Sequence, residues 1–203
     1  FPAILNVWFG GCESGDAICD VLFGDKVPSG KLTATMPKSV GQIPLYYNHL
    51  NTGRPLKEGK WFSKFTSNYL DIDNDPLYPF GYGLSYTTFK YGKPTLSSNT
   101  MTNNETISVS VDITNTGNYD ADEIAQMYIR DLAASVSRPV KELKGFERIS
   151  IKKGETKTVT FTITPEDLKF YNQELEYKNE PGEFEVMVGP NSKDVQTLTF
   201  TLK

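Results

Sequence analysis

The chain has 203 residues, of which 21 are basic and 25 acidic, and its formal net charge is -4. Hydrophobic residues make up 38% of the sequence, enough for a buried core in one large or two small domains. No apolar run approaches the roughly 20 residues that cross a bilayer, and no basic cluster indicates nucleic-acid binding. We therefore expect neither a membrane nor a nucleic acid among its partners.

The first nine residues are apolar but contain no Met, no basic start and no small-residue cleavage site. Because a signal peptide needs these features, the segment is not interpreted as one. Residues 4–9 form a nearly continuous apolar run, typical of a strand buried on both faces of a parallel sheet. An apolar start without Met is what we expect of a sequence that begins inside a longer protein. The exposed edge of such a strand predicts either self-association through residues 1–36 or disorder there.

A glycine pair and a helix follow this predicted strand. Gly10 and Gly11 end the apolar run, Glu13 or Ser14 can cap the helix, and Gly24 suits a left-handed C-terminal cap. The stripe predicted to be buried consists of Ala17, Ile18, Val21 and Leu22. Strand, glycine loop and helix make half of a βαβ unit.

The glycine loop has one alternative interpretation. Gly10 and Gly15 have the glycine spacing of a phosphate-binding Walker A motif. Asp16 stands where that motif needs a lysine, which would place an anion beside an anion. We therefore reject nucleotide binding and interpret the glycine pair as a tight turn at the end of a strand.

The sequence then becomes irregular. A short strand is predicted at residues 32–36, and residues 37–86 are rich in Pro, Gly, Asn and aromatics without sustained periodicity. This composition predicts a long connector with one or two local strands. Residues 1–88 hold 10 of the 16 glycines and 7 of the 12 prolines, so we place a domain boundary at residue 88.

Residues 89–203 have the pattern of a sheet protein. Ile107, Val109, Val111 and Ile113 alternate with polar residues, as in a strand with one buried face. Seven strands are predicted, at residues 107–113, 124–129, 143–149, 159–163, 175–177, 184–188 and 198–202. A helical turn is predicted at residues 165–168, with Thr164 as its N-cap. Seven short strands in about 115 residues predict an immunoglobulin-like or fibronectin type III-like sandwich.

The sequence indicates no metal site and no cofactor. His49 is the only histidine, and no Cys-x-x-Cys pair occurs. Cys12 and Cys19 are expected to be free thiols, because two helical turns would separate their Cα atoms by about 10 Å. Aspartates 71, 73 and 75 alternate as in a calcium loop, but the required glycine and closing glutamate do not follow, so they predict a solvated turn.

Several motifs resemble those of glycoside hydrolase family 3, in the order found there. Residues 8–25, 28–32 and 36–39 resemble the end of the family's α/β-sandwich domain. Residues 41–55 and 79–89 look most like the periplasmic bacterial β-glucosidases of that family. Residues 115–117, 137–146 and 181–184 are similar to its C-terminal fibronectin type III-like domain. The expected fold is therefore mainly β: a C-terminal remnant of an α/β-sandwich domain (residues 1–88) followed by a fibronectin type III-like sandwich (residues 89–203).

The resemblance implies a retaining exo-β-glucosidase that releases terminal β-D-glucosyl residues from glycosides or oligosaccharides. Such enzymes use an aspartate nucleophile and a glutamate acid/base. The family supplies both from a barrel domain and an α/β segment upstream of this sequence, so we expect no catalytic residue within residues 1–203. The chain alone is expected to be inactive and to support those absent domains. The resemblance also implies a periplasmic or secreted location.

Three residues are candidates for substrate binding. Glu13 either lines the sugar pocket or is a helix N-terminal charge favoured by the helix dipole. Asn48 and Arg54 carry hydrogen-bond donors for sugar hydroxyls, beside aromatic side chains able to stack on a sugar ring. Alternatively, these aromatics fix the connector onto the domains beneath it. A second function class is also open, a non-catalytic carbohydrate-binding or spacer sandwich.

Overall fold

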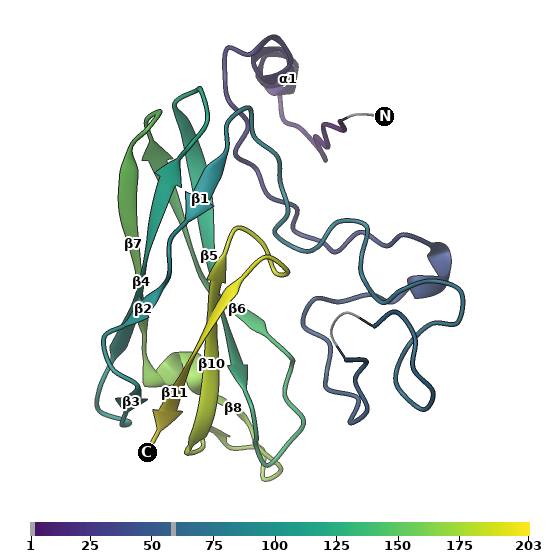
Figure 1. Cartoon of the computed structure of the whole chain (residues 1–203), viewed down its shortest axis with the longest axis vertical. Helices are drawn as coiled ribbons and strands as arrows, with labels where there is room; N and C mark the ends of the chain where they lie inside the picture. Colours follow the sequence, from purple (N-terminus) through teal and green to yellow (C-terminus); the bar gives the residue numbers. More distant parts are fainter. Residues whose placement is uncertain (1–2, 58–59) are drawn as a thin grey trace.

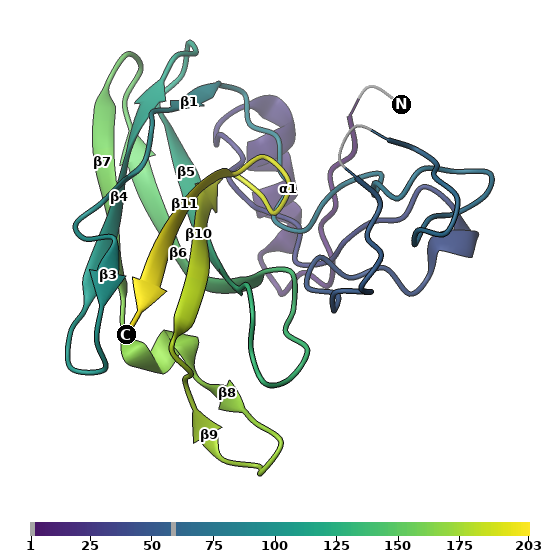
Figure 2. The same ribbon diagram turned by 60° about the horizontal axis from the view of Figure 1, so that its bottom comes forward.

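The computed structural model describes residues 3–57 and 60–203. Residues 1–2, which open the apolar segment and the predicted 1–36 association surface, lie outside the described residues. Figures 1 and 2 show a β-sandwich formed by the second half of the chain, with helix α1 and the irregular connector of the first half beside it. The sandwich confirms the predicted fold class.

The sandwich has two antiparallel layers with one parallel edge. In the first sheet, β4 (Ile107–Asn115) is central and pairs with β7 (Thr156–Ile163), β1 (Phe89–Tyr91) and β2 (Thr95–Leu96). The order in the second sheet is β3 (Thr100–Met101), β11 (Gln196–Leu202), β10 (Gly182–Gly189), β5 (Ala121–Asp131) and β6 (Glu142–Ile151). The short strand β3 joins β11 in parallel. A separate ribbon consists of β8 (Phe170–Tyr171) and β9 (Tyr177–Lys178).

The core lies between these two sheets. Every second residue of β4, from Ile107 to Ile113, is buried, as the alternation predicts. The opposite sheet supplies apolar partners for them, among which the rings of Phe184 and Phe200 stack with centroids 5.5 Å apart. Each layer thus buries one face against the other, and this burial stabilises the sandwich.

The predicted strands of the second half are confirmed except for one. Leu175 lies in the turn between β8 and β9 with a φ of 60°, so the strand predicted at 175–177 is reduced to Tyr177 and Lys178. Strands β1, β2, β3 and β8, of two or three residues each, were not predicted. The predicted helical turn is confirmed as η2 (Pro165–Leu168), where the Asp167 carboxylate accepts hydrogen bonds from the backbone N–H and the hydroxyl of Thr164.

The predicted helix is also confirmed, as α1 (Ser14–Phe23), with Gly24 forming its left-handed C-cap. Its predicted buried stripe is wrong, because no residue of α1 is buried and Leu22 is 62% exposed. In the part of the chain that the structure describes, no sheet and no second helix covers the apolar side of α1. Among the described residues, no helix has the length and apolar character needed to cross a membrane.

The strand predicted at residues 4–9 is wrong. These residues are irregular and exposed, and no strand in the described part of the chain pairs with them. A strand needs a neighbour to bond its N–H and C=O groups, and without one this apolar run has no reason to be extended.

Residues 32–36 form no regular strand either. Met36 makes a single isolated bridge to Tyr78, and Leu32 donates its N–H to the Tyr82 carbonyl at 2.8 Å. The connector is irregular, as predicted, in its described residues 37–57 and 60–86, except for one short 3-10 helix, η1 (Val40–Gln42). In place of the expected local strands, the described connector has isolated bridges.

The connector is ordered around the buried side chain of Gln42. Its amide oxygen accepts from the Lys38 N–H at 2.6 Å, and its amide nitrogen donates to the carbonyls of Asp73 and Asp75 at 3.0 and 3.1 Å. The alternating aspartates thus form a turn wrapped around an amide, not a cation loop. A hydrogen bond from Lys38 lowers the pKa of Asp73.

Candidate functional site

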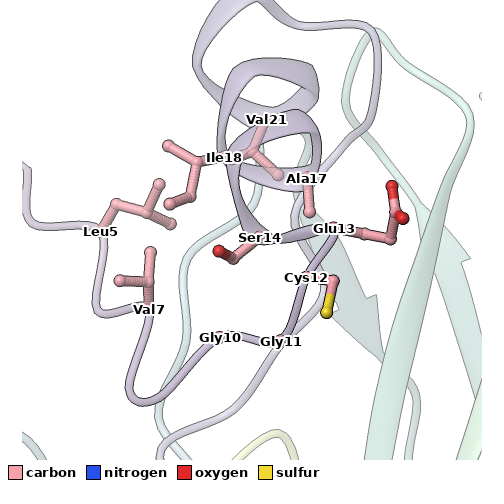
Figure 3. A pocket seen from close by; sticks show the side chains of 10 residues that line it. All are labelled: Leu5, Val7, Gly10, Gly11, Cys12, Glu13, Ser14, Ala17, Ile18 and Val21. Atoms are coloured by element: carbon pink, nitrogen blue, oxygen red, sulfur yellow. The ribbon is translucent and has the colours of Figure 1, made fainter.

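The first cavity lies between the apolar N-terminal segment and α1. It has a volume of about 500 Å³ and is lined by Leu5, Val7, Gly10, Gly11, Cys12, Glu13, Ser14, Ala17, Ile18 and Val21. Figure 3 shows Leu5 and Val7 on one side of this space and the helix residues Ile18 and Val21 on the other. Most of this lining is aliphatic, so it favours apolar contacts.

Glu13 contributes little polarity to this cavity. Its side chain extends away from Leu5 and Val7 in Figure 3, and it is exposed. Glu13 occupies the N-cap position of α1, where its backbone carbonyl accepts from the Ala17 N–H at 3.1 Å, but its side chain makes no capping bond. This placement agrees with the interpretation as a charge at the helix start.

The second cavity lies on the connector and has a volume of about 480 Å³. It is lined by Thr33, Ala34, Thr35, Pro37, Ile43, Pro44, Leu45, Tyr46, Tyr47, Asn48 and Phe80. Exposed side chains on its rim include Tyr46 and Asn48. An aromatic and aliphatic lining with a few hydroxyl and amide groups suits a neutral ligand.

One wall of the second cavity is fixed to the sandwich. The Tyr47 ring stacks on Phe80 at 4.2 Å and meets Tyr128 of β5 edge-on at 5.8 Å. The Leu143 N–H of β6 donates to the Tyr47 hydroxyl at 3.3 Å. Tyr47 therefore attaches the connector to the domain beneath, as the alternative interpretation of these aromatics predicts, whereas Tyr46 stays exposed.

Arg54 lies apart from both cavities. It is exposed, lines neither of them, and its backbone carbonyl accepts from the Ser67 N–H at 2.8 Å. Glu13 lines the first cavity and Asn48 the second. The described residues thus do not bring the three candidates into one site.

A buried polar cluster at the junction of the two halves was not predicted. Lys31 lies 3.1 and 3.3 Å from the two carboxylate oxygens of Glu123 on β5, and the Tyr91 hydroxyl donates to the nearer one at 2.9 Å. Burial, followed by the Glu123 charge, raises the pKa of Tyr91. The strand predicted at 124–129 excluded Glu123, so its charge was not seen as part of a buried strand.

The described residues contain no group of three His, Cys, Asp or Glu side chains placed to hold a metal ion. Cys12 and Cys19 are free and exposed. His49 interacts with a neighbouring backbone group, because its Nδ1 lies 3.0 Å from the Leu50 carbonyl oxygen.

Comparisons with known proteins identify the family. Residues 1–86 match the glycosyl hydrolase family 3 C-terminal domain, and residues 123–192 match the fibronectin type III-like domain. The chain belongs to glycosyl hydrolase family 3. The two matches follow each other in the order that the sequence motifs predict.

Relatives of this family 3 chain cover nearly all of it. A periplasmic beta-glucosidase of Salmonella typhimurium is 56% identical over 98% of the chain and 26% of its own length. A beta-xylosidase of Formosa agariphila is 47% identical over 100% of the chain and 27% of its own length. The crystal structure of a Listeria innocua beta-glucosidase in complex with glucose superposes with a TM-score of 0.89 at 45% identity, over 96% of this chain and 27% of that one. The chain therefore spans about a quarter of the length of the relatives it matches.

Proposed function

We propose that the chain forms the C-terminal portion of a retaining, exo-acting β-glucosidase that hydrolyses terminal β-D-glucosyl residues of glycosides or oligosaccharides. The observation that carries this proposal is 56% identity to the Salmonella beta-glucosidase over 98% of the chain. The fold likeness to the Listeria enzyme supports it. Because a beta-xylosidase is also similar to the chain, the activity assay should compare aryl β-glucosides with aryl β-xylosides.

The 203-residue chain is inactive by itself in this proposal. A retaining glycosidase needs two carboxyl groups about 5 Å apart on either side of the scissile bond. Of the two cavities, the first is lined by one carboxylate, Glu13, and the second by none. The nucleophile and the acid/base would come from a barrel domain and a further α/β segment outside residues 1–203.

An aryl β-glucoside assay tests this proposal, with a longer protein carrying the barrel and this chain as the positive control. We expect product only from the longer protein. Hydrolysis by the 203-residue chain above buffer background would overturn the claim of inactivity. Binding of cellobiose by the chain alone in calorimetry would favour the alternative, a carbohydrate-binding sandwich.

In this proposal Glu13, Asn48 and Arg54 border the substrate in the longer protein. Arg54 is the sharpest test, because it is exposed and lines neither cavity, so its truncation should not disturb packing. Loss of a hydrogen bond to a sugar hydroxyl predicts that Arg54→Ala lowers kcat/KM about tenfold. Arg148→Ala, on the sandwich, is the matched control, and equal rates for both variants would remove Arg54 from the site.

The proposed protein has a domain boundary at residue 88, which is supported by the change in composition and by the two family matches on either side of it. A periplasmic or secreted location is supported by the name of the Salmonella relative.

The proposed self-association through residues 1–36 is supported by the exposure of Phe9 and Phe23. Sedimentation on dilution tests it: Phe23→Ser should weaken association, Phe146→Ser on the sandwich should not, and a wild-type monomer at all concentrations would exclude it.

A further inference from the structure

Two backbone segments of the first half run antiparallel to each other next to the sandwich, and we call the place where residues 30–32 and 81–83 pair the crossing. The Leu32 N–H donates to the Tyr82 carbonyl at 2.8 Å, and the Gly81 N–H donates to the Leu32 carbonyl at 2.7 Å. The crossing is tight, since a Cβ on Gly83 would lie 2.3 Å from the Gly30 carbonyl oxygen. Residues 30–32, which follow α1, and residues 81–83, which end the connector, therefore form one packed unit.

Strand β5 holds this crossing at Glu123. The carboxylate is bonded by Lys31 and by the Tyr91 hydroxyl, and Glu123 is only 4% exposed. The side chain of Lys31 is 12% exposed. A buried carboxylate that loses its cation is left uncompensated, which is strongly unfavourable, whereas removing both charges is tolerated.

The same strand holds the crossing a second time at Gln126. Its amide nitrogen donates to the Gly81 carbonyl at 3.1 Å and to the Pro190 carbonyl at 2.7 Å, while its oxygen accepts from the Tyr128 hydroxyl at 2.5 Å. Gln126 is buried and its amide is bonded at both ends. Glu123 has the strand parity of the core residue Ala125, whereas Gln126 has the opposite parity, so the two contacts lie on opposite faces of β5.

We propose that Lys31, Glu123, Tyr91 and Gln126 form a clasp that fixes the crossing to β5 from both faces. Through residues 24–30 the clasp also positions α1, whose Val21 carbonyl accepts from the Tyr86 hydroxyl at 2.6 Å. The sandwich thereby acts as a positioning element for the family 3 C-terminal part. This role is independent of the proposed glucosidase activity, because it is measured on the chain itself.

Site-resolved hydrogen exchange on the 203-residue chain tests the clasp. Lys31→Met should speed exchange of the Leu32 and Gly81 amides about tenfold or more, because the crossing opens locally. The amides of β10, which is paired on both sides, should exchange as in the wild type. Lys178→Met is the matched control, since Lys178 forms an exposed ion pair with Glu176 and should change neither region.

A second variant separates loss of the clasp from the cost of an unpaired buried charge. The triple variant Lys31→Met/Glu123→Leu/Tyr91→Phe leaves no buried charge without a partner but has none of the three side-chain bonds, so the Leu32 and Gly81 amides should still exchange about tenfold faster than in the wild type. A return to wild-type exchange would overturn the proposal, because the acceleration in Lys31→Met would then come from the uncompensated Glu123 charge alone. Unchanged exchange in Lys31→Met would overturn the proposal. Equal acceleration in β10 would also overturn it, because these residues would then stabilise the sandwich as a whole and not position the crossing.

Discussion

The two halves of the chain contain the same kinds of apolar residue, but the sandwich buries them and helix α1 leaves them exposed. Phe184 in β10 is 1% exposed, whereas Phe23 at the end of α1 is 83% exposed. In the sandwich each sheet covers the other, whereas no sheet or second helix among the described residues of the first half covers α1. The comparison shows that correct local structure is not sufficient for burial, because an apolar face also needs a second layer.

The polar contacts differ in the same way. Where the sandwich meets the first half, the buried side chains of Gln126 and Glu123 are hydrogen-bonded. In α1 the N-cap side chain makes no capping bond. Figure 2 shows α1 beside the sandwich, and no residue of this helix is buried.

The largest expected effect separates the two phenylalanines. Phe184→Ala removes a ring that stacks on Phe200 in the core and should lower the free energy of unfolding by about 3–5 kcal/mol. Phe23→Ala, on the exposed helix end, should change it by no more than about 0.5 kcal/mol. Urea unfolding followed by far-ultraviolet circular dichroism measures both, and a large loss in Phe23→Ala would break the comparison.

A smaller effect is expected where the halves meet. Gly81 has a φ of 78°, and a Cβ there would lie 2.0 Å from the Gln126 side-chain oxygen. Gly154 has a φ of 75° with open space around it. Gly154→Ala should cost about 1–2 kcal/mol from backbone strain alone. Gly81→Ala should cost about 1–3 kcal/mol more, because Gln126 must give up buried hydrogen bonds.

Urea unfolding of Gly81→Ala and Gly154→Ala measures how much more free energy of unfolding the first variant loses than the second. A larger loss in Gly81→Ala shows that the junction contributes to the stability of the sandwich. Equal losses would mean that Gln126 moves without cost, and that the first half rests on the sandwich without supporting it.

Much of the sandwich could be predicted because its signals are local. The alternation at residues 107–113 and the Thr164-Pro165 start of η2 each determine structure within a few residues. Strands β1 to β3 were missed because two or three residues are too few to show a period. The strand predicted at residues 4–9 is wrong for a different reason. The apolar run is long enough to predict a strand, but no strand among the described residues pairs with it.

The candidate site was harder to predict than the fold. Glu13, Asn48 and Arg54 were chosen for their chemistry, but proximity depends on how an irregular connector winds, and no periodic pattern encodes that path. The Lys31–Glu123 pair spans 92 positions and leaves no short-range signal. Gln126 was detectable in principle, as a polar residue at a position inside an otherwise apolar predicted strand.

The smallest expected effect is on the pH dependence of stability, and it concerns two aspartates, one in each half, whose pKa values are shifted in opposite directions. Burial raises the pKa of Asp131 in β5, whose Oδ2 is buried without a hydrogen-bond partner among the described residues. A hydrogen bond from Lys38 lowers the pKa of Asp73 on the connector. Both groups are partly in contact with solvent, which screens them, so we expect modest slopes of stability against pH and not large differences.

The signs of these slopes follow from proton linkage. A raised folded-state pKa means that the native state holds the Asp131 proton more tightly, so wild-type stability falls as pH rises above the unfolded value of about 3.9. An asparagine side chain does not titrate, so Asp131→Asn should gain stability relative to wild type between pH 3 and pH 7. Asp73→Asn should lose stability relative to wild type over the same range, because the lowered pKa stabilises the native state above pH 3.9. Unfolding curves at several pH values that showed slopes of the same sign would mean that burial in the sandwich does not set the pKa of Asp131.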